Sequence, residues 1–335
     1  MSPLVPGLLA AAAVALIARV TVGFLPVPIA DASIALLIGL VVGQVAASRQ
    51  ELLRPGATTA ARVFLRLGIV LLGARLSLGQ IATIGLPAAV VVAITMTAVF
   101  AAVIVAARTL HVDGVLAVLL AVGTAVCGNS AIIATAPVIG ARSREVAYAV
   151  ATITLFGTAA VFVYPAIGHL VGMADTPFGL WSGIAINDTS QVVAAGSAYS
   201  PHALDVATVV KLIRNSLMAP LLVLIAWGWS RGARTDADAG GGLRKAVPLF
   251  VVGFLVMAAL RTVGVIDAPS AAVLDTVARL LILVALAGVG LSIQVGDLRS
   301  VGPRPLALGL AAALVAGGVT LAAINLFNLG AAIRI

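Results

Sequence analysis

Long runs of apolar residues recur along the whole chain, and short polar stretches separate them. Each run is close to the ~20 residues that a helix needs to cross the hydrocarbon core of a bilayer. The period-two alternation typical of membrane β-barrel strands is absent. The pattern therefore predicts an all-α polytopic membrane protein. The eleven predicted spans are residues 4–20, 31–47, 62–80, 86–107, 114–139, 146–171, 178–197, 205–229, 246–264, 272–294 and 305–327.

The connections between the spans are short, and Pro and Gly mark most of them. Only residues 230–245 form a loop of any size, and their Gly, Asp and Arg content is typical of a solvated linker. Because no Lys or Arg precedes the span at 4–20, we interpret it as a retained helix and not as a signal peptide. Residues 1–335 are therefore predicted to form a single transmembrane domain.

An internal repeat is expected within this domain. Without the first span, ten spans remain, and they divide into two five-helix repeats at about 31–171 and about 178–327. An odd number of spans inverts the second repeat relative to the first, an arrangement common in transporters. This division pairs the fifth span with the tenth. A competing match between residues 71–81 and 286–296 pairs the third span with the tenth, and the sequence leaves both pairings open.

Composition supports the membrane assignment. Hydrophobic residues make up 62% of the 335 residues and charged residues only 10%, against about 25% charged in a typical soluble domain. The net charge of +8 comes from basic loops, so it does not indicate nucleic acid. Counting Lys and Arg in the loops places the amino terminus in the cytoplasm. Arg142 and Arg144 are exceptions, because this orientation puts them outside.

The fifth span contains a polar interruption, "GTAVCGNSAIIATAPVIG" at 123–140. We expect its centre to be unwound, with a half-helix starting near Asn129 and Ser130, whose side chains are good N-caps. The free N–H groups at a helix N-terminus attract anions. The alternative is close helix packing through small residues. The candidate substrate-binding residues of this segment are Cys127, Gly128, Asn129 and Ser130.

The seventh span carries a second interruption, "SGIAINDTSQVVAAG" at 182–196. A carboxylate at the bilayer centre costs about 2.5–3.5 kcal/mol even on the most permissive insertion scale, so Asp188 needs a partner, water or a proton. We assign it as a candidate coupling residue, with capping of a half-helix at 189–196 as the structural alternative. The candidate substrate-binding residues beside it are Asn187, Thr189, Ser190 and Gln191.

The tenth span also contains glycines, Gly288 and Gly290, and is expected to be the second discontinuous helix, crossing the fifth span near the midplane. Gly290 and Ser292 are therefore candidate binding residues. Nearer its start, Asp275 and Arg279 are four residues apart and are expected to form a local ion pair.

The eighth span contributes a basic pair, Lys211 and Arg214, on one helix face. The pair could neutralise Asp188 or bind a substrate anion, and both residues are candidate binding residues. Snorkelling to the membrane surface is the alternative for Lys211. Arg75, in the third span, stays without an assigned role.

No residue pattern indicates an enzyme. The three histidines fall at loop ends, and no Ser/His/Asp or metal-ligand spacing links them. The single cysteine excludes an internal disulfide and a cysteine-only metal cage. No Walker-type loop is present. We therefore expect no catalytic residues, no metal and no cofactor.

Five segments resemble the YeiH-type family, which is labelled as sulfate exporters. They are "GTAVCGNSAIIATAPVIGA", "AVATITLFGTAAVFVYPAIG", "GIAINDTSQVVAAGSAYS", "VVKLIRNSLMAP" and "GLSIQVGDLRSVGPRPL", and the likeness covers nearly the whole chain. The resemblance implies a secondary transporter of the bacterial inner membrane, distantly similar in fold to cation/proton antiporters and bile-acid-type symporters. Such folds cross two broken helices between a core and a panel domain. Asn187 stands where many members have His, so proton coupling would depend on Asp188.

These observations together predict an alternating-access exporter of a small anion, such as sulfate or a related sulfur oxyanion, with H⁺ or Na⁺ as a potential coupling ion. The lipid bilayer is the expected surrounding, a homodimer is a potential assembly, and no nucleic acid is expected. The first alternative is a cation/proton antiporter in which Asp188 binds the ion. The second is a passive anion channel with the same polar crossing, and a membrane enzyme is the most distant alternative.

Overall fold

The computed structural model describes residues 3–22, 31–46, 50–218, 249–293 and 302–329, together with 221, 222, 224, 225 and 227. Every element in these ranges is a helix. The elements are α1 (Val5–Val22), α2 (Asp31–Val45), α3 (Gln50–Thr59), η2 (Ala60–Phe64), α4 (Leu65–Leu72), η3 (Gly73–Arg75), α5 (Leu78–Thr109), α6 (Gly114–Ala125), α7 (Asn129–Thr135), α8 (Ser143–Leu170), α9 (Asp175–Ala185), α10 (Thr189–Tyr199), α11 (Pro201–Ser216), α13 (Leu249–Thr262), α14 (Ala268–Ser292) and α16 (Pro303–Leu326).

The helices suit a polytopic membrane protein. Five are both long and apolar enough to cross a bilayer by themselves: Glu51–Arg75, Leu78–Thr109, Arg144–Leu170, Ala268–Ser292 and Pro303–Leu326. Each of the eleven predicted spans overlaps a described helix, but several of these helices are short. The number of spans and the inverted repeats therefore stay predictions. The predicted linker at 230–245 lies outside the described residues.

The chain divides into two compact units. Unit 1 comprises residues 1–82, 193–205 and 249–295, and unit 2 comprises 83–192, 206–248 and 296–335. Both units draw on both predicted repeats. The hairpin formed by α10 and α11 is shared, because its tip at 193–205 belongs to unit 1 and its two outer ends belong to unit 2.

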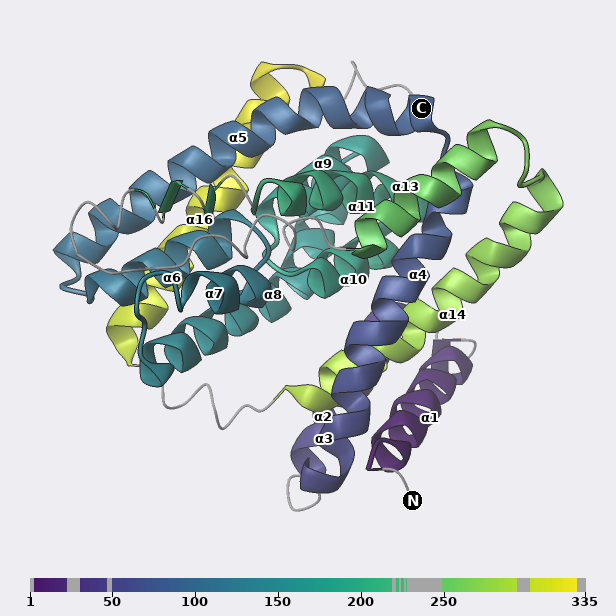
Figure 1. The fold of residues 1–335 in the computed structure, drawn as a ribbon, viewed down its shortest axis with the longest axis horizontal. Helices are drawn as coiled ribbons and strands as arrows, with labels where there is room; N and C mark the ends of the chain where they lie inside the picture. The colour runs from purple at the N-terminus through teal and green to yellow at the C-terminus, as the bar shows by residue number, and fades with distance from the viewer. Residues whose placement is uncertain are drawn as a thin grey trace. The chain divides into compact units, whose positions relative to one another are not determined.

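Unit 1 is built around α14, which lies alongside α1, α2 and α4 (Figure 1). The helices approach closely because small residues face one another: a Cβ on Gly290 would lie 2.8 Å from the Leu40 nitrogen and 3.0 Å from the Gly39 carbonyl carbon. Such contacts are typical of membrane helix packing. The buried residues of this core are Ala11, Val14, Ala15, Ala18, Ile34, Ala35, Ala57, Ala60, Leu283, Ala287 and Leu291.

Unit 2 packs α6 and α9 against α8 and α16. Polar contacts pin α16 within it: the Trp181 indole N–H donates to the Gly317 carbonyl oxygen at 3.0 Å, and the Thr95 and Thr320 hydroxyls lie 3.2 Å apart. The Tyr164 ring stacks on Trp181 with ring centroids 4.1 Å apart. These contacts hold the frame around two interrupted helices.

The interruptions occur in the fifth and seventh predicted spans, and the expected break in the tenth is wrong. Helix α14 runs without a break from Ala268 to Ser292, through both glycines. Each glycine lowers helix propensity by about 1 kcal/mol relative to alanine. Here Gly288 packs closely on α3 and η2, and Gly290 on α2, so packing favours the regular helix. The fifth span is divided into α6 and α7 and the seventh into α9 and α10.

Candidate functional site

The two helix breaks of unit 2 contact each other. Helix α6 ends at Ala125 and α7 begins at Asn129, while α9 ends at Ala185 and α10 begins at Thr189. A Cβ on Gly128 would lie 3.5 Å from both the Asn187 carbonyl carbon and the Asp188 Cβ. We call residues 126–128 and 186–188 the helix crossing.

Glycine at position 128 is needed for the turn between α6 and α7. Gly128 has φ +64° and ψ −125°, a backbone conformation open to glycine and strained for residues with a Cβ. It is also the N-cap of α7, and no side chain caps this helix end. The expectation that Asn129 or Ser130 caps the half-helix is therefore wrong, because the turn places both residues inside the first helical turn.

Asp188 caps α10, as its structural interpretation predicts. Its Oδ1 accepts hydrogen bonds from the Ser190 backbone N–H at 2.9 Å and from the Ser190 hydroxyl at 2.6 Å. In return, the Gln191 Oε1 accepts from the Asp188 backbone N–H at 3.1 Å. This reciprocal capping box provides hydrogen-bond acceptors for N–H groups that lipid could not satisfy. The carboxylate itself remains partly exposed.

The position of the Gln191 side chain depends on a glycine of α8. A Cβ on Gly157 would fall on the Gln191 carboxamide, 2.6 Å from Nε2 and nearer still to Oε1. Gln191 is buried, at 6% exposure. Gly157 thus leaves the space in which the side chain turns back to bond the N-terminus of α10. No spacing rule connects residues 34 positions apart, so the role of Gly157 could not be predicted from the sequence.

Lys211 of α11 is fully buried, with 0% exposure. Its Nζ donates to three backbone carbonyl oxygens at the crossing: Val126 at 3.0 Å, Ile186 at 2.9 Å and Asn187 at 2.5 Å. A lysine ammonium has three hydrogens, and these bonds use all of them. The snorkelling interpretation of Lys211 is therefore wrong.

Arg214 makes the same kind of contact one helical turn later. Its guanidinium is 1% exposed. Nε donates to the Ala125 carbonyl oxygen at 2.9 Å and Nη1 to that of Ile186 at 2.8 Å. It also donates to the carbonyl oxygens of Thr124 and Ile184. Four of its five N–H donors therefore bond the ends of α6 and α9.

These bonds explain why two cations lie inside an apolar unit. A helix C-terminus leaves up to four carbonyl groups unpaired and carries about half a negative charge. Two helices ending in the membrane interior need donors that lipid does not provide. Lys211 and Arg214 supply those donors to both ends at once, so α11 ties the two interrupted helices together. With Asp188 ionised, the three side chains sum to a charge of +1.

Several acceptors around the crossing still lack a partner. Among the described residues, the buried carboxamide oxygens of Asn129, Asn187 and Asn215 accept no hydrogen bond, and neither do the hydroxyls of Thr124 and Thr208. The Asn215 Nδ2 donates to the Thr189 hydroxyl at 3.1 Å, which places Asn215 beside the start of α10. An unpaired buried acceptor is costly, so these oxygens indicate a place where a donor or a cation would be favourable.

The remaining candidates divide between the crossing and unit 1. Cys127 is buried, with Sγ 3.5 Å from the Met218 Sδ. The Asn129 Nδ2 donates to the Thr154 hydroxyl at 3.2 Å, a partner that the sequence did not indicate, and Ser130 is exposed. Gly290 and Ser292 belong to unit 1. Gly290 packs on α2 within unit 1, and the Ser292 hydroxyl donates to the Gly288 carbonyl oxygen at 2.7 Å.

Over the ranges that the structure describes, no three His, Cys, Asp or Glu side chains are grouped to hold a metal ion. What the geometry provides is a partly exposed carboxylate, two buried cations and several free acceptors where two helix breaks contact. This arrangement can hold a small ion or a proton.

Comparison with known proteins identifies the family. The model of the family described as Conserved hypothetical protein 698 matches residues 6–309. A UPF0324 membrane protein of Bdellovibrio bacteriovorus is 37% identical over 262 residues, covering 78% of this chain and 79% of its own. The UPF0324 inner membrane protein YeiH of Escherichia coli K12 is 33% identical over 292 residues, covering 85% of this chain and 83% of its own. No solved structure matches. The chain therefore belongs to the YeiH-type UPF0324 family and is a multi-pass protein of the bacterial inner membrane.

Proposed function

We propose that the protein is a secondary active transporter that exports a small anion by alternating access, with the ion bound at the helix crossing. The observation that supports this proposal is the contact between the two breaks, with Asp188 partly exposed there and Lys211 and Arg214 buried beside it. Interrupted helices at membrane depth are a recurring way to build an ion site in transporters.

The charge balance at the crossing supports an anion as the transported ion. The net charge of +1 on Lys211, Arg214 and Asp188 favours an anion, and the Ser130 hydroxyl and the Asn129 carboxamide are the nearest candidates to donate to it. The two cations act mainly through their charge, because all three ammonium hydrogens of Lys211 and four of the five N–H groups of Arg214 are already bonded to carbonyl oxygens. Sulfate and related sulfur oxyanions are the substrates that the family resemblance suggests.

Asp188 is the residue that we assign to coupling. Its carboxylate can take up a proton while staying at the N-terminus of α10. An anion and a proton at the same crossing attract each other, so the two would move in a linked cycle.

The experiment compares wild-type protein with Asp188→Asn in proteoliposomes. Asn is as good an N-cap as Asp, so the substitution removes the titratable charge and keeps the cap. We expect wild-type protein to accumulate labelled sulfate or thiosulfate against its gradient when a pH gradient is imposed. Asp188→Asn should still bind the anion but accumulate none. Proton-driven accumulation that persists in Asp188→Asn would remove Asp188 from the coupling step.

A cation/proton antiporter is the second candidate, and the unpaired oxygens of Asn187 and Asn215 favour it. Carboxamide and carboxylate oxygens are suitable ligands for a hard cation. Exchange of Na⁺ for H⁺ without anion movement would support this candidate. Downhill anion flux that no ion gradient can drive uphill would instead indicate a channel.

Arg214→Ala is a poor test of either candidate. The substitution would leave the carbonyl groups of two helix ends without donors, so a loss of transport would not distinguish substrate binding from folding.

A further inference from the structure

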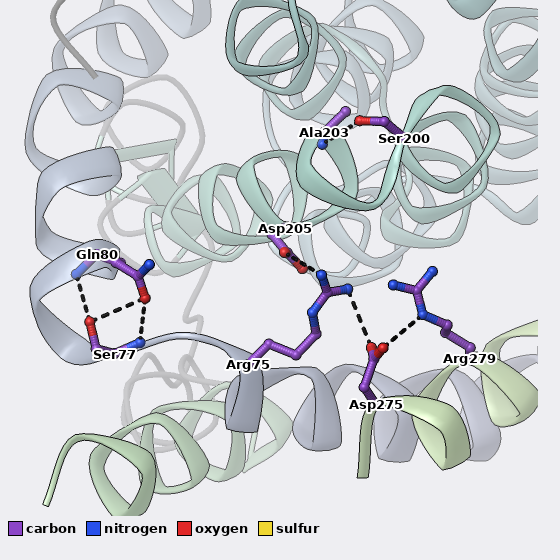
Figure 2. Close-up of polar contacts among 8 residues, drawn as sticks. All are labelled: Arg75, Ser77, Gln80, Ser200, Ala203, Asp205, Asp275 and Arg279. Carbon is purple, nitrogen blue, oxygen red and sulfur yellow. Dashed lines mark hydrogen bonds and ion pairs between the residues drawn. The ribbon is translucent and has the colours of Figure 1, made fainter. Parts of the chain in front are cut away.

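Four charged side chains of unit 1 form a network that includes neither Lys211 nor Arg214. The Arg75 guanidinium bridges two carboxylates, with Nη2 3.1 Å from the Asp205 Oδ2 and Nη1 3.3 Å from the Asp275 Oδ1. The Arg279 Nε bonds the Asp275 Oδ2 at 3.0 Å, so the predicted local pair on α14 is confirmed. Figure 2 shows Arg75 reaching from the end of η3 towards α11 on one side and α14 on the other.

The chain is fixed on both sides of this network. After Arg75, Ser77 and Gln80 make a reciprocal cap at the start of α5: the Ser77 N–H donates to the Gln80 Oε1 at 2.9 Å and the Gln80 N–H to the Ser77 Oγ at 3.2 Å (Figure 2). Before Asp205, the Ser200 Oγ accepts from the Ala203 N–H at 3.0 Å and caps α11 (Figure 2). The guanidinium therefore joins two preorganised chain segments.

The two helices of the hairpin approach each other closely at its tip. A Cβ on Gly196 would lie 2.9 Å from the Leu204 Cα, so α10 and α11 are in backbone contact next to Asp205. A force on Asp205 is consequently carried into both helices of the hairpin. Helix α11 continues to Lys211 and Arg214, and α10 starts at Thr189, next to its cap Asp188.

The partial exposure of these side chains suits an ion pair that separates and forms again. The Asp205 side chain is 9% exposed and that of Arg75 22%. Asp205 Oδ1, among the described residues, accepts no hydrogen bond, so Arg75 is the main support of a nearly buried carboxylate. The pair is not fully buried, which lowers the cost of separating it relative to a fully buried one.

We propose that Arg75 is a latch that holds the tip of the α10–α11 hairpin, and that separation of Arg75 from Asp205 is a step of the transport cycle. This inference rests on the proposed function. Residues 193–205 belong to unit 1, whereas the hairpin segments that carry Asp188, Lys211 and Arg214 belong to unit 2. A cycle that moves the crossing must move the hairpin, and the tip is where an ion pair restrains it.

The test measures amide hydrogen exchange of residues 193–205 in purified full-length protein, together with anion transport in proteoliposomes. The latch variants are Arg75→Gln and Asp205→Asn. Asp205→Asn keeps the side-chain shape and leaves Arg75 paired with Asp275, so it provides a variant that folds if Arg75→Gln does not. The matched control is Arg279→Gln, which removes a more exposed arginine from the same network and leaves the Arg75–Asp205 pair intact.

We expect both latch variants to speed exchange of 193–205 by about tenfold, since exchange reports local opening. The initial transport rate should change by about threefold or more in the same two variants, because the barrier between the two states changes. The control should show neither effect. Unchanged exchange in both latch variants would overturn the proposal, and faster exchange with unchanged transport would also do so, because the pair would then be only a structural tie.

The two proposals fail in different ways. Wild-type protein that moves no anion in any gradient would contradict the proposed function. Wild-type protein that transports, with latch variants that match it in both measurements, would contradict the latch alone.

Discussion

Lys211 gives the clearest case in which one side chain decides whether the helix crossing can form. Its ammonium bonds three carbonyl oxygens from two helix breaks, and it is fully buried. Lys211→Met keeps the length of the side chain and removes every donor. Each buried acceptor left without a donor costs about 1–3 kcal/mol. The substitution leaves three such carbonyl oxygens, so we expect about 3 kcal/mol or more to be lost from the free energy of unfolding.

Denaturant titration in detergent micelles measures this loss. The matched control is Arg62→Met, which removes an exposed cation of η2 and should change the unfolding free energy by no more than about 0.5 kcal/mol. Equal effects of the two substitutions would mean that water or other groups support the carbonyl oxygens, and the explanation of the buried charge would be wrong.

Gly157 provides a second prediction for a single residue. In Gly157→Ala the new Cβ would occupy the space of the Gln191 carboxamide, and the hydrogen bond that Gln191 accepts from the Asp188 N–H would break. We expect a loss of about 1 kcal/mol, the typical value of one hydrogen bond, seen as a lower melting temperature. Gly318→Ala, on α16 with open space around it, should not lower the melting temperature. A Gly157→Ala protein as stable as that control would show that Gln191 can bond elsewhere.

At the scale of helices, the sequence predicts breaks best where polar residues accompany glycine. The break at 126–128 overlaps the Cys-Gly-Asn-Ser motif, and the break at 186–188 overlaps the Asn-Asp-Thr-Ser motif. The half-helix predicted at 189–196 is observed as Thr189–Tyr199. Gly288 and Gly290 have only apolar neighbours, and their helix stays intact. Glycine alone therefore indicates close packing as readily as a break.

The partners of these elements could not be predicted from the sequence. Lys211 and Arg214 were recognisable as a basic pair, but the expected partners were Asp188 or an anion. Their observed partners are backbone carbonyl oxygens of α6 and α9. Every residue has a backbone carbonyl group, so no sequence pattern shows which of these groups will accept the bonds. Arg75 and Asp205 lie 130 positions apart, and no spacing rule connects them, so their ion pair could not be predicted either.

The packing role of α14 leads to a prediction about Gly290. A Cβ at this position meets backbone atoms of α2, which cannot rotate away. Overpacking of this kind costs about 1–3 kcal/mol, so Gly290→Ala should lower the melting temperature by several degrees. Anion affinity should be unchanged, because Gly290 packs on α2 within unit 1. A stable Gly290→Ala protein with altered anion affinity would return this residue to the list of binding residues.

At the scale of the whole molecule, both units depend on spans that are interrupted or short, so membrane topology is the strictest check of the fold. From the start of α6 to the end of α7 the chain has about 22 residues, which would reach about 33 Å as a continuous helix. This length just matches a hydrocarbon core of about 30 Å. The interrupted helix can therefore cross the bilayer once, provided that both halves point the same way.

Reporter fusions at three successive loops test that crossing. With the amino terminus in the cytoplasm, His111 should lie inside, Gly140 outside and Gly172 inside. Alkaline phosphatase, which is active only after export, should be active when fused at Gly140 and inactive at the other two positions. The loop at Gly140 carries Arg142 and Arg144, and their charge alone favours a cytoplasmic position. If this loop is nevertheless external, the reason is that α6 and α7 together cross the membrane. A phosphatase inactive at all three positions would mean that the interrupted helix re-enters the cytoplasmic side, and the crossing could then not be reached from both faces of the membrane.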